Sequence, residues 1–145
     1  MKIKFSLIII ILILSSGFIF NPISEFKNNV LKNSNSAEIK FYAHKEARTD
    51  IKKQFTFKTK EEIKNILSFI SDKSAPFYKG GYNGSIDFLK NGKSLLDEKM
   101  EFNLSKYMGH IVFSYKKKLY SKKLTGSCLK YLQELSNKKA FTKIK

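Results

Sequence analysis

Hydrophobic and polar positions alternate along much of the chain after residue 37. Ile39 and Phe41 alternate with polar neighbours, which predicts a strand over 38–44. Phe55 and Phe57 repeat the period of two and predict a second strand. The same pattern predicts strands around 86–88, over 93–104 with a bulge in its middle, over 111–115 and at 119–120.

Two segments follow the helical period instead. The first covers 60–71 and begins after Thr59, which stands three residues before Glu62, the spacing of a capping box. Its apolar positions are Ile63, Ile66, Leu67 and Ile70. The second begins after Thr125, and its apolar positions are Cys128, Leu129, Leu132 and Leu135. Strands in runs with helices set apart predict an α+β fold, a small antiparallel sheet with two helices packed on one face.

Three connections are visible between these elements. Asn91-Gly92 predicts a two-residue hairpin turn, because both residues tolerate positive φ. Lys116-Lys117-Lys118 predicts a turn between the strands at 111–115 and 119–120. Residues 71–84 contain Pro76 and three glycines and predict a long loop.

The first two dozen residues have a pattern of their own. Lys2 and Lys4 precede a run from Phe5 to Phe20 that carries no charge. A basic start followed by an apolar run predicts a signal peptide or membrane anchor over 1–23, with the rest of the chain exported. A helix over 5–20 would span about 24 Å, short of a hydrocarbon core of about 30 Å. Cleavage near Gly17 and retention as an anchor both stay open.

The pattern after this segment predicts three further regions. Residues 24–36 are rich in Asn and Ser and predict a linker, with one helical turn around Val30 and Leu31. Residues 37–137 form the predicted α+β domain, and 138–145 form a basic tail.

Charge narrows the choice of partner. The chain carries a formal net charge of +16, from 28 basic and 12 acidic residues. Arg48 is its only arginine. Arginine is the side chain that forms bidentate hydrogen bonds to phosphates and to the edge of guanine, so nucleic acid is not an expected partner. The expected partners are a membrane, through the N-terminal segment, and an anionic envelope polymer, lipid head groups or an envelope protein. The alternative is that the lysine excess is compositional.

One loop segment combines three aromatic residues with a lysine. Loops on a rigid scaffold often carry binding residues, and exposed tyrosines suit sugars, peptides or protein partners. The alternative is that some of these rings cap the core. The binding candidates are Phe77, Tyr78, Lys79, Tyr82 and Asn83 of this loop, with Lys116, Lys117 and Lys118.

Catalytic and metal motifs are weak. Cys128 is the only cysteine, so it has no internal disulfide partner, and its place on a helical apolar face predicts core packing. His44 and His110 are far apart and form no metal motif, and we expect no catalytic residue, metal site or cofactor. The leading hypothesis is a small exported or membrane-tethered, non-catalytic binding or accessory module at the cell envelope. The rival is a small envelope hydrolase that uses His110 with Cys128 or an acidic residue.

Overall fold

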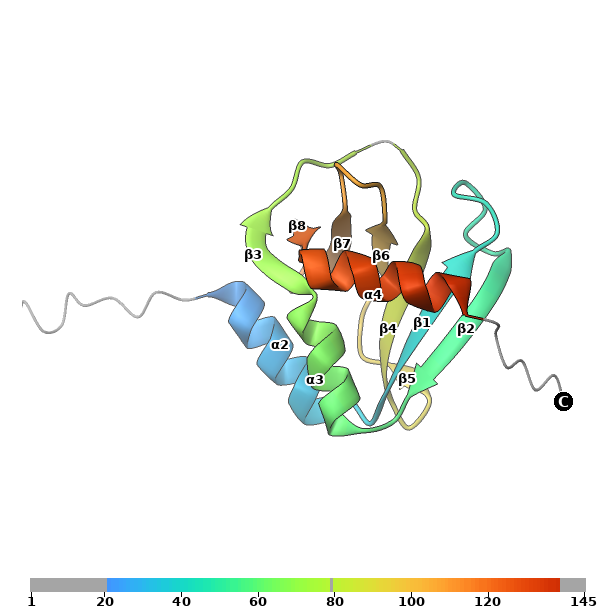
Figure 1. The fold of residues 1–145 in the computed structure, drawn as a ribbon. Coiled ribbons are helices and arrows are strands. Elements are labelled where there is room, and N and C mark those ends of the chain that lie inside the picture. Colours follow the sequence, from blue (N-terminus) through green and yellow to red (C-terminus); the bar gives the residue numbers. More distant parts are fainter. Residues whose placement is uncertain (1–20, 79, 139–145) are drawn as a thin grey trace, which may run out of the picture.

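The computed structural model describes residues 21–78 and 80–138. The apolar N-terminal run, Lys79 and residues 139–145 of the basic tail lie outside the described residues. The helices are α2 (Pro22–Asn33), α3 (Lys60–Ser68) and α4 (Gly126–Asn137) (Figure 1). The strands are β1 (Ser36–Tyr42), β2 (Ile51–Phe57), β3 (Ile70–Ser74), β4 (Gly84–Lys90), β5 (Lys93–Ser94), β6 (Met100–Asn103), β7 (His110–Tyr115) and β8 (Lys118–Leu124).

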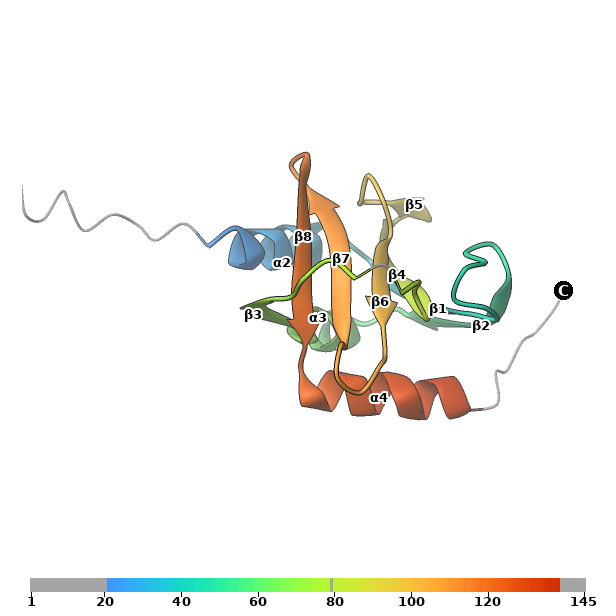
Figure 2. The same ribbon diagram turned by 90° about the horizontal axis from the view of Figure 1, so that it is seen from above.

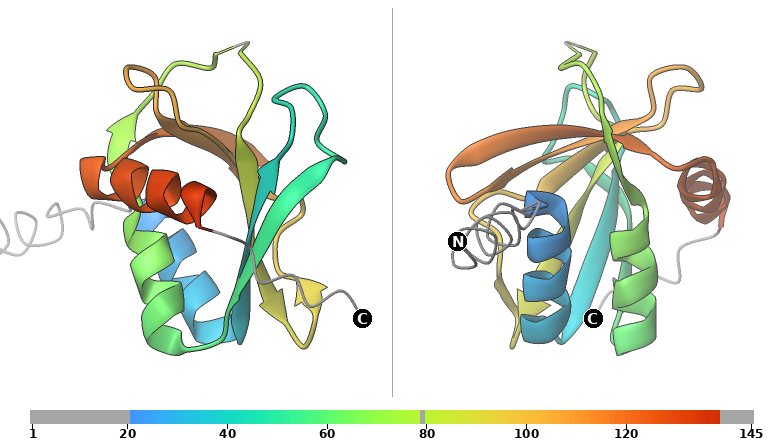
Figure 3. Two further views of the ribbon diagram at one scale, coloured as in Figure 1. Left: turned by 45° about the vertical axis from the view of Figure 1, so that its right-hand side comes forward. Right: turned by 90° about the vertical axis from the view of Figure 1, so that its left-hand side faces the viewer.

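These strands form one antiparallel sheet. Over the described residues it has eight strands in the order β2-β1-β4-β6-β7-β8-β3, with β5 paired to β4 beside this path. The sheet bends strongly, so that β7 and β8 run at a steep angle to β1 and β2 (Figure 3). The α+β prediction is therefore confirmed. The part of the chain that the structure describes has three helices, however, where the sequence predicted two.

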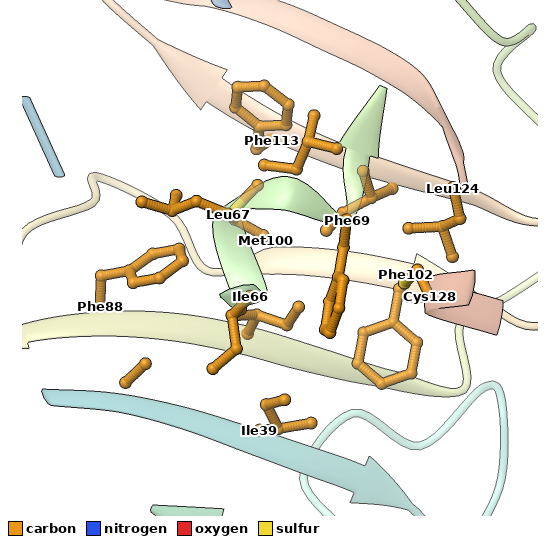
Figure 4. Packing of buried hydrophobic residues seen from close by; sticks show 14 of the residues in the cluster. Ile39, Ile66, Leu67, Phe69, Phe88, Met100, Phe102, Phe113, Leu124 and Cys128 are labelled. Carbon is orange, nitrogen blue, oxygen red and sulfur yellow. The ribbon is translucent and has the colours of Figure 1, made fainter. Parts of the chain in front are cut away.

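A single hydrophobic core lies between the helices and one face of the sheet. Paired residues on neighbouring strands point into it, for example Ile39 opposite Ile86 and Phe102 opposite Ile111. Helices α3 and α4 cover these side chains (Figure 4). The most buried large side chains include Phe26, Ile63, Ile66, Phe88, Phe102, Phe113 and Leu132.

The predicted linker over 24–36 is wrong, because most of it is helix α2. Ile23, Phe26 and Val30 follow the spacing i, i+3, i+7, and all three are buried. The Phe26 ring stacks on Phe113 of β7 with 4.7 Å between centroids. The side chain of Asn21 caps the helix by accepting hydrogen bonds from the backbone N–H groups of residues 23 and 24. Helix α2 is therefore part of the folded domain.

Two other boundaries differ from the predictions. The helix predicted over 60–71 ends at Ser68, and Ile70 begins strand β3, where it pairs with Leu124 of β8. The long loop predicted over 71–84 is therefore partly strand. The strand predicted over 93–104 divides into β5 and β6, and residues 95–99, where a bulge was predicted, are not strand.

The two hairpin turns share one backbone conformation. Asn91 and Gly92 have φ values of 52° and 78°, as the Asn-Gly sequence predicts. Lys116 and Lys117 have φ values of 50° and 62° between the paired residues Tyr115 and Lys118. Both hairpins thus use two residues in the left-handed region. Such a conformation costs a residue other than glycine roughly 1–2 kcal/mol, so the Lys-Lys turn is strained.

Across residues 21–78 and 80–138, no helix has the length and apolar character needed to cross a membrane.

Candidate functional site

Residues 75–78 and 80–83, which contain four of the predicted binding candidates, cross the sheet on the face opposite the helices (Figure 2). The backbone N–H of Ala75 donates to the Ser121 carbonyl at 2.9 Å, and the Ser121 hydroxyl donates to the Pro76 carbonyl at 3.2 Å. Further along, the Asn103 side chain donates to the Gly81 carbonyl at 2.9 Å. Because Ser121 and Asn103 alternate with core residues on their strands, these bonds hold the loop over the second face of the sheet.

Two tyrosines of this loop cover a buried histidine. The ring centroids of Tyr78 and Tyr82 lie 5.0 Å and 6.1 Å from that of His110, which is 1% exposed. Nδ1 of His110 lies 2.6 Å from the Met108 carbonyl, so it carries the proton and donates to that oxygen. Nε2 is buried and has no hydrogen-bond partner among the described residues. Tyr78 and Tyr82 therefore act mainly as a lid over His110.

The outer side of Tyr82 contacts the only arginine. The Arg48 guanidinium lies 5.4 Å from the centre of the Tyr82 ring, and its Nε lies 3.1 Å from Oε1 of Glu101. Burial raises the pKa of Glu101, and Arg48 opposes that shift. Asp97 and Glu98 line the open groove of about 430 Å³ beside this pair. The positive charge of Arg48 is thus used within the molecule.

The remaining loop candidates divide between structure and surface. The Asn83 side chain accepts a hydrogen bond of 2.8 Å from the backbone N–H of Leu104, so its role is to hold the loop. Phe77 is different, because its ring is 60% exposed. Of the loop candidates that the structure describes, Phe77 is the one available to a partner.

Phe77 belongs to a groove of about 350 Å³ beside β8. Lys118, one of the predicted lysines, lines the same groove, as do Leu119, Lys122 and Pro22. Leu119 is 50% exposed. We call this set of five residues the basic–apolar groove. It brings together Phe77 of the loop and Lys118 of the hairpin, and it adds three residues that the sequence did not predict as site residues.

The hairpin tip beside this groove is tied to the first turn of α2. The Lys116 amino group forms a hydrogen-bonded ion pair with Oε1 of Glu25, and the Tyr115 hydroxyl donates to the same oxygen at 3.2 Å. The bond from Lys116 lowers the pKa of Glu25, and the same bond raises the pKa of Lys116. The Phe26 ring packs edge-on against Tyr115. Lys117 and Lys118 remain exposed, as a binding role requires.

The candidate catalytic groups are not brought together. Cys128 is fully buried between α4 and the sheet, near Phe102 (Figure 4), as its position on a helical apolar face predicted. Burial raises the pKa of its thiol to about 12. His110 precedes the core residue Ile111, so its side chain lies on the opposite face of the sheet.

Within the described residues, His110 has no carboxylate partner and no metal-binding cluster is formed. The only hydrogen bond that the described residues give the His110 ring is the one to Met108, so no carboxylate orients it. No group of three or more His, Cys, Asp or Glu residues that could hold a metal ion occurs within the described part of the chain.

Comparison of the chain with known protein families, with curated proteins and with solved structures finds no match. Its function is therefore inferred from its own residues and their arrangement.

Proposed function

We propose that this chain is a small exported or membrane-tethered module of the cell envelope that binds a partner and performs no catalytic step of its own. The basic–apolar groove is the observation that carries this proposal. Phe77 and Leu119 expose large apolar side chains there, next to Lys118 and Lys122. Exposed apolar side chains that gather with lysines on one surface favour an interaction site.

The buried positions of the reactive groups support a binding role over the hydrolase alternative. A thiol with a pKa of about 12 is protonated at physiological pH and is a poor nucleophile. The imidazole of His110 lies on the other side of the sheet, under Tyr78 and Tyr82.

The charge of the module favours an anionic partner. Lysine presents a point charge that suits a diffuse anionic surface, whereas arginine suits a single phosphate because it can form two hydrogen bonds to it at once. An anionic envelope polymer, lipid head groups and an acidic envelope protein all fit this chemistry. The basic start and apolar run of the first twenty residues favour export, since both are features of signal and anchor segments.

Export is tested by fusing residues 1–20 to a reporter that is active only outside the cytoplasm. The fusion ends at residue 20 because α2 is part of the folded domain. We expect reporter activity, and mass spectrometry of the native N-terminus then distinguishes cleavage near Gly17 from a retained anchor. A full-length product in the cytoplasm would overturn the proposal.

Binding is tested by sedimenting the full chain with isolated cell envelopes at low and high salt. We expect binding that weakens steeply with salt, because the Debye length falls from about 10 Å at 0.1 M to about 3 Å at 1 M. Cys128→Ala should bind as the parent chain does. No binding at low salt would contradict a binding role for the lysines. Binding lost specifically in folded Cys128→Ala would favour the hydrolase.

A further inference from the structure

We infer that the basic–apolar groove is a membrane-docking surface, which holds the domain against an anionic lipid bilayer beside the segment that precedes Pro22. In this arrangement Phe77 and Leu119 enter the interfacial region, and the exposed Lys117 and Lys118 face the lipid head groups. The Lys122 amino group instead donates to the Asp72 carbonyl at 2.9 Å. The inference rests on the proposed export of the chain and names which of the possible anionic partners the groove contacts.

The place where the described domain starts is the first support. The apolar run ends at Phe20, Asn21 caps helix α2, and Pro22 lines the groove. Phe20 and Pro22 are two residues apart, so their Cα atoms are separated by at most about 7 Å. A bilayer that holds the run would therefore begin close to the groove. If the chain is cleaved near Gly17, the apolar residues Phe18, Ile19 and Phe20 still precede it directly.

The second support is that the hairpin tip is fixed on the same side. Glu25 lies in the first turn of α2 and binds both Lys116 and Tyr115, and Phe26 packs against Tyr115. The start of α2 and the tip of the β7–β8 hairpin therefore keep a constant relation to each other. Lysines 117 and 118 are held near the point where the N-terminal segment joins the domain.

The third support is the chemistry of the exposed side chains. Aromatic and large aliphatic residues with neighbouring lysines are the combination by which peripheral surfaces enter a membrane interface. Each lysine near an anionic surface strengthens partitioning about fivefold, which corresponds to about 1 kcal/mol. Lys117 and Lys118 could therefore contribute up to about 25-fold together, and the two apolar residues add to that.

The Lys-Lys turn is the fourth support. Both residues have positive φ, a conformation that Asn-Gly adopts with less strain at the equivalent turn after β4. Backbone strain at an exposed position points to a use for the side chains that are kept there. A soluble polymer or a protein could also bind lysines, but neither explains why the groove adjoins the end of the apolar run.

The test uses the full chain in vesicles of phosphatidylglycerol and phosphatidylcholine, with vesicles of phosphatidylcholine alone for comparison. In a Cys128→Ala background, an apolar fluorophore is attached at Leu119→Cys or, as the matched control, at Thr56→Cys. Thr56 is exposed on β2, at the opposite edge of the sheet. Quenching by spin-labelled lipid head groups reports how close each position lies to the bilayer.

We expect strong quenching at position 119 and little at position 56. Quenching should fall in phosphatidylcholine alone, at high salt, and in Lys117→Gln with Lys118→Gln. Since each lysine contributes about fivefold, the double variant should weaken docking by up to about 25-fold. Lys52→Gln with Lys58→Gln, which removes the same charge from the β2 side, should leave docking unchanged.

Amide hydrogen exchange of the unmodified chain provides a measurement without labels. Anionic vesicles should slow exchange around residues 74–77 and 115–122 and leave β2 unchanged. If the chain floats with vesicles but position 119 is quenched no more than position 56, docking is wrong and the proposed export and binding roles stand. If the chain does not float with vesicles at all, both membrane tethering and docking are wrong.

Discussion

Replacing Lys116 and Lys117 with Asn and Gly tests whether the β7–β8 turn makes the fold less stable because it carries lysines at both positions. The two lysines have φ values of 50° and 62°, in the left-handed region that Asn and Gly adopt more readily. The turn after β4 has the same two-residue form and carries Asn91-Gly92. We therefore expect the Asn-Gly variant to fold more stably and to dock on anionic vesicles more weakly.

The expected gain follows from the backbone conformation. Relief of the left-handed conformation is worth roughly 1–2 kcal/mol where glycine replaces another residue, and less for asparagine. Glycine also makes the unfolded chain more flexible, which offsets about 0.4–1 kcal/mol. The net gain should be about 1 kcal/mol, or a rise of about 4 °C in Tm for a domain of this size. The variant also removes the contact of Lys116 with Glu25. Lys117→Gly alone keeps that contact and isolates the effect of the backbone.

Urea unfolding measures the change in stability, and the vesicle quenching experiment measures docking. The reverse exchange, Asn91→Lys with Gly92→Lys, is the matched control and should lower the midpoint of unfolding by a similar amount or more. A folded Asn-Gly variant that is less stable than the parent would refute the strain argument. A variant that is more stable and docks equally well would refute the functional reason for keeping the lysines.

Three further predictions concern the core, the sheet and the helix cap. Cys128 should react slowly with maleimide near neutral pH in the folded chain and quickly in urea, because burial raises the pKa of its thiol to about 12. Rapid labelling without urea would contradict this. Cys128→Ala should lower the free energy of unfolding by about 1–2 kcal/mol. Gly84→Ala should destabilise the fold by about 3 kcal/mol in urea unfolding, because a Cβ there meets the Lys40 carbonyl oxygen and the Phe102 ring, whereas Gly80→Ala, with open space, should change little. Hydrogen bonds from the backbone and side chain of Thr59 lower the pKa of Glu62. The stability that this carboxylate adds should therefore be present above its ordinary pKa near 4.5 and lost as pH falls below it; equal acid sensitivity in Glu62→Gln would argue against this.

The sequence predicted elements well where a local pattern determines them. Alternation at Ile39 and Phe41 predicted β1, and the Thr59–Glu62 capping box has both of its hydrogen bonds. Helix α2 was missed although Ile23, Phe26 and Val30 have helical spacing. Asn, Ser and Lys fill most of its other positions, and such a helix depends on packing against the rest of the domain. The spacing was the available signal, and the polar composition obscured it.

The candidate site was predictable only in parts. Phe77, Lys117 and Lys118 are exposed, and their role in binding stays a prediction. Tyr78 and Tyr82 instead cover His110, because the second face of the sheet carries polar groups that need partners. The groove itself depends on the pairing of β3 with β8, which joins Ser74 to Lys122. No local pattern specifies a pairing between segments so far apart in the sequence.

The position of α2 also has a consequence for the order in which the chain folds. Phe26 is near the start of the domain, yet its ring packs on Phe113, and β1 pairs with β4 through Ile39 and Ile86. A chain that is made from its N-terminus exposes Phe26 until β7 has emerged, and contacts between distant segments form slowly. Helix α2, which joins the apolar run to the domain, is therefore among the last elements to gain its partners. Until then the apolar side chains of α2 stay available to chaperones.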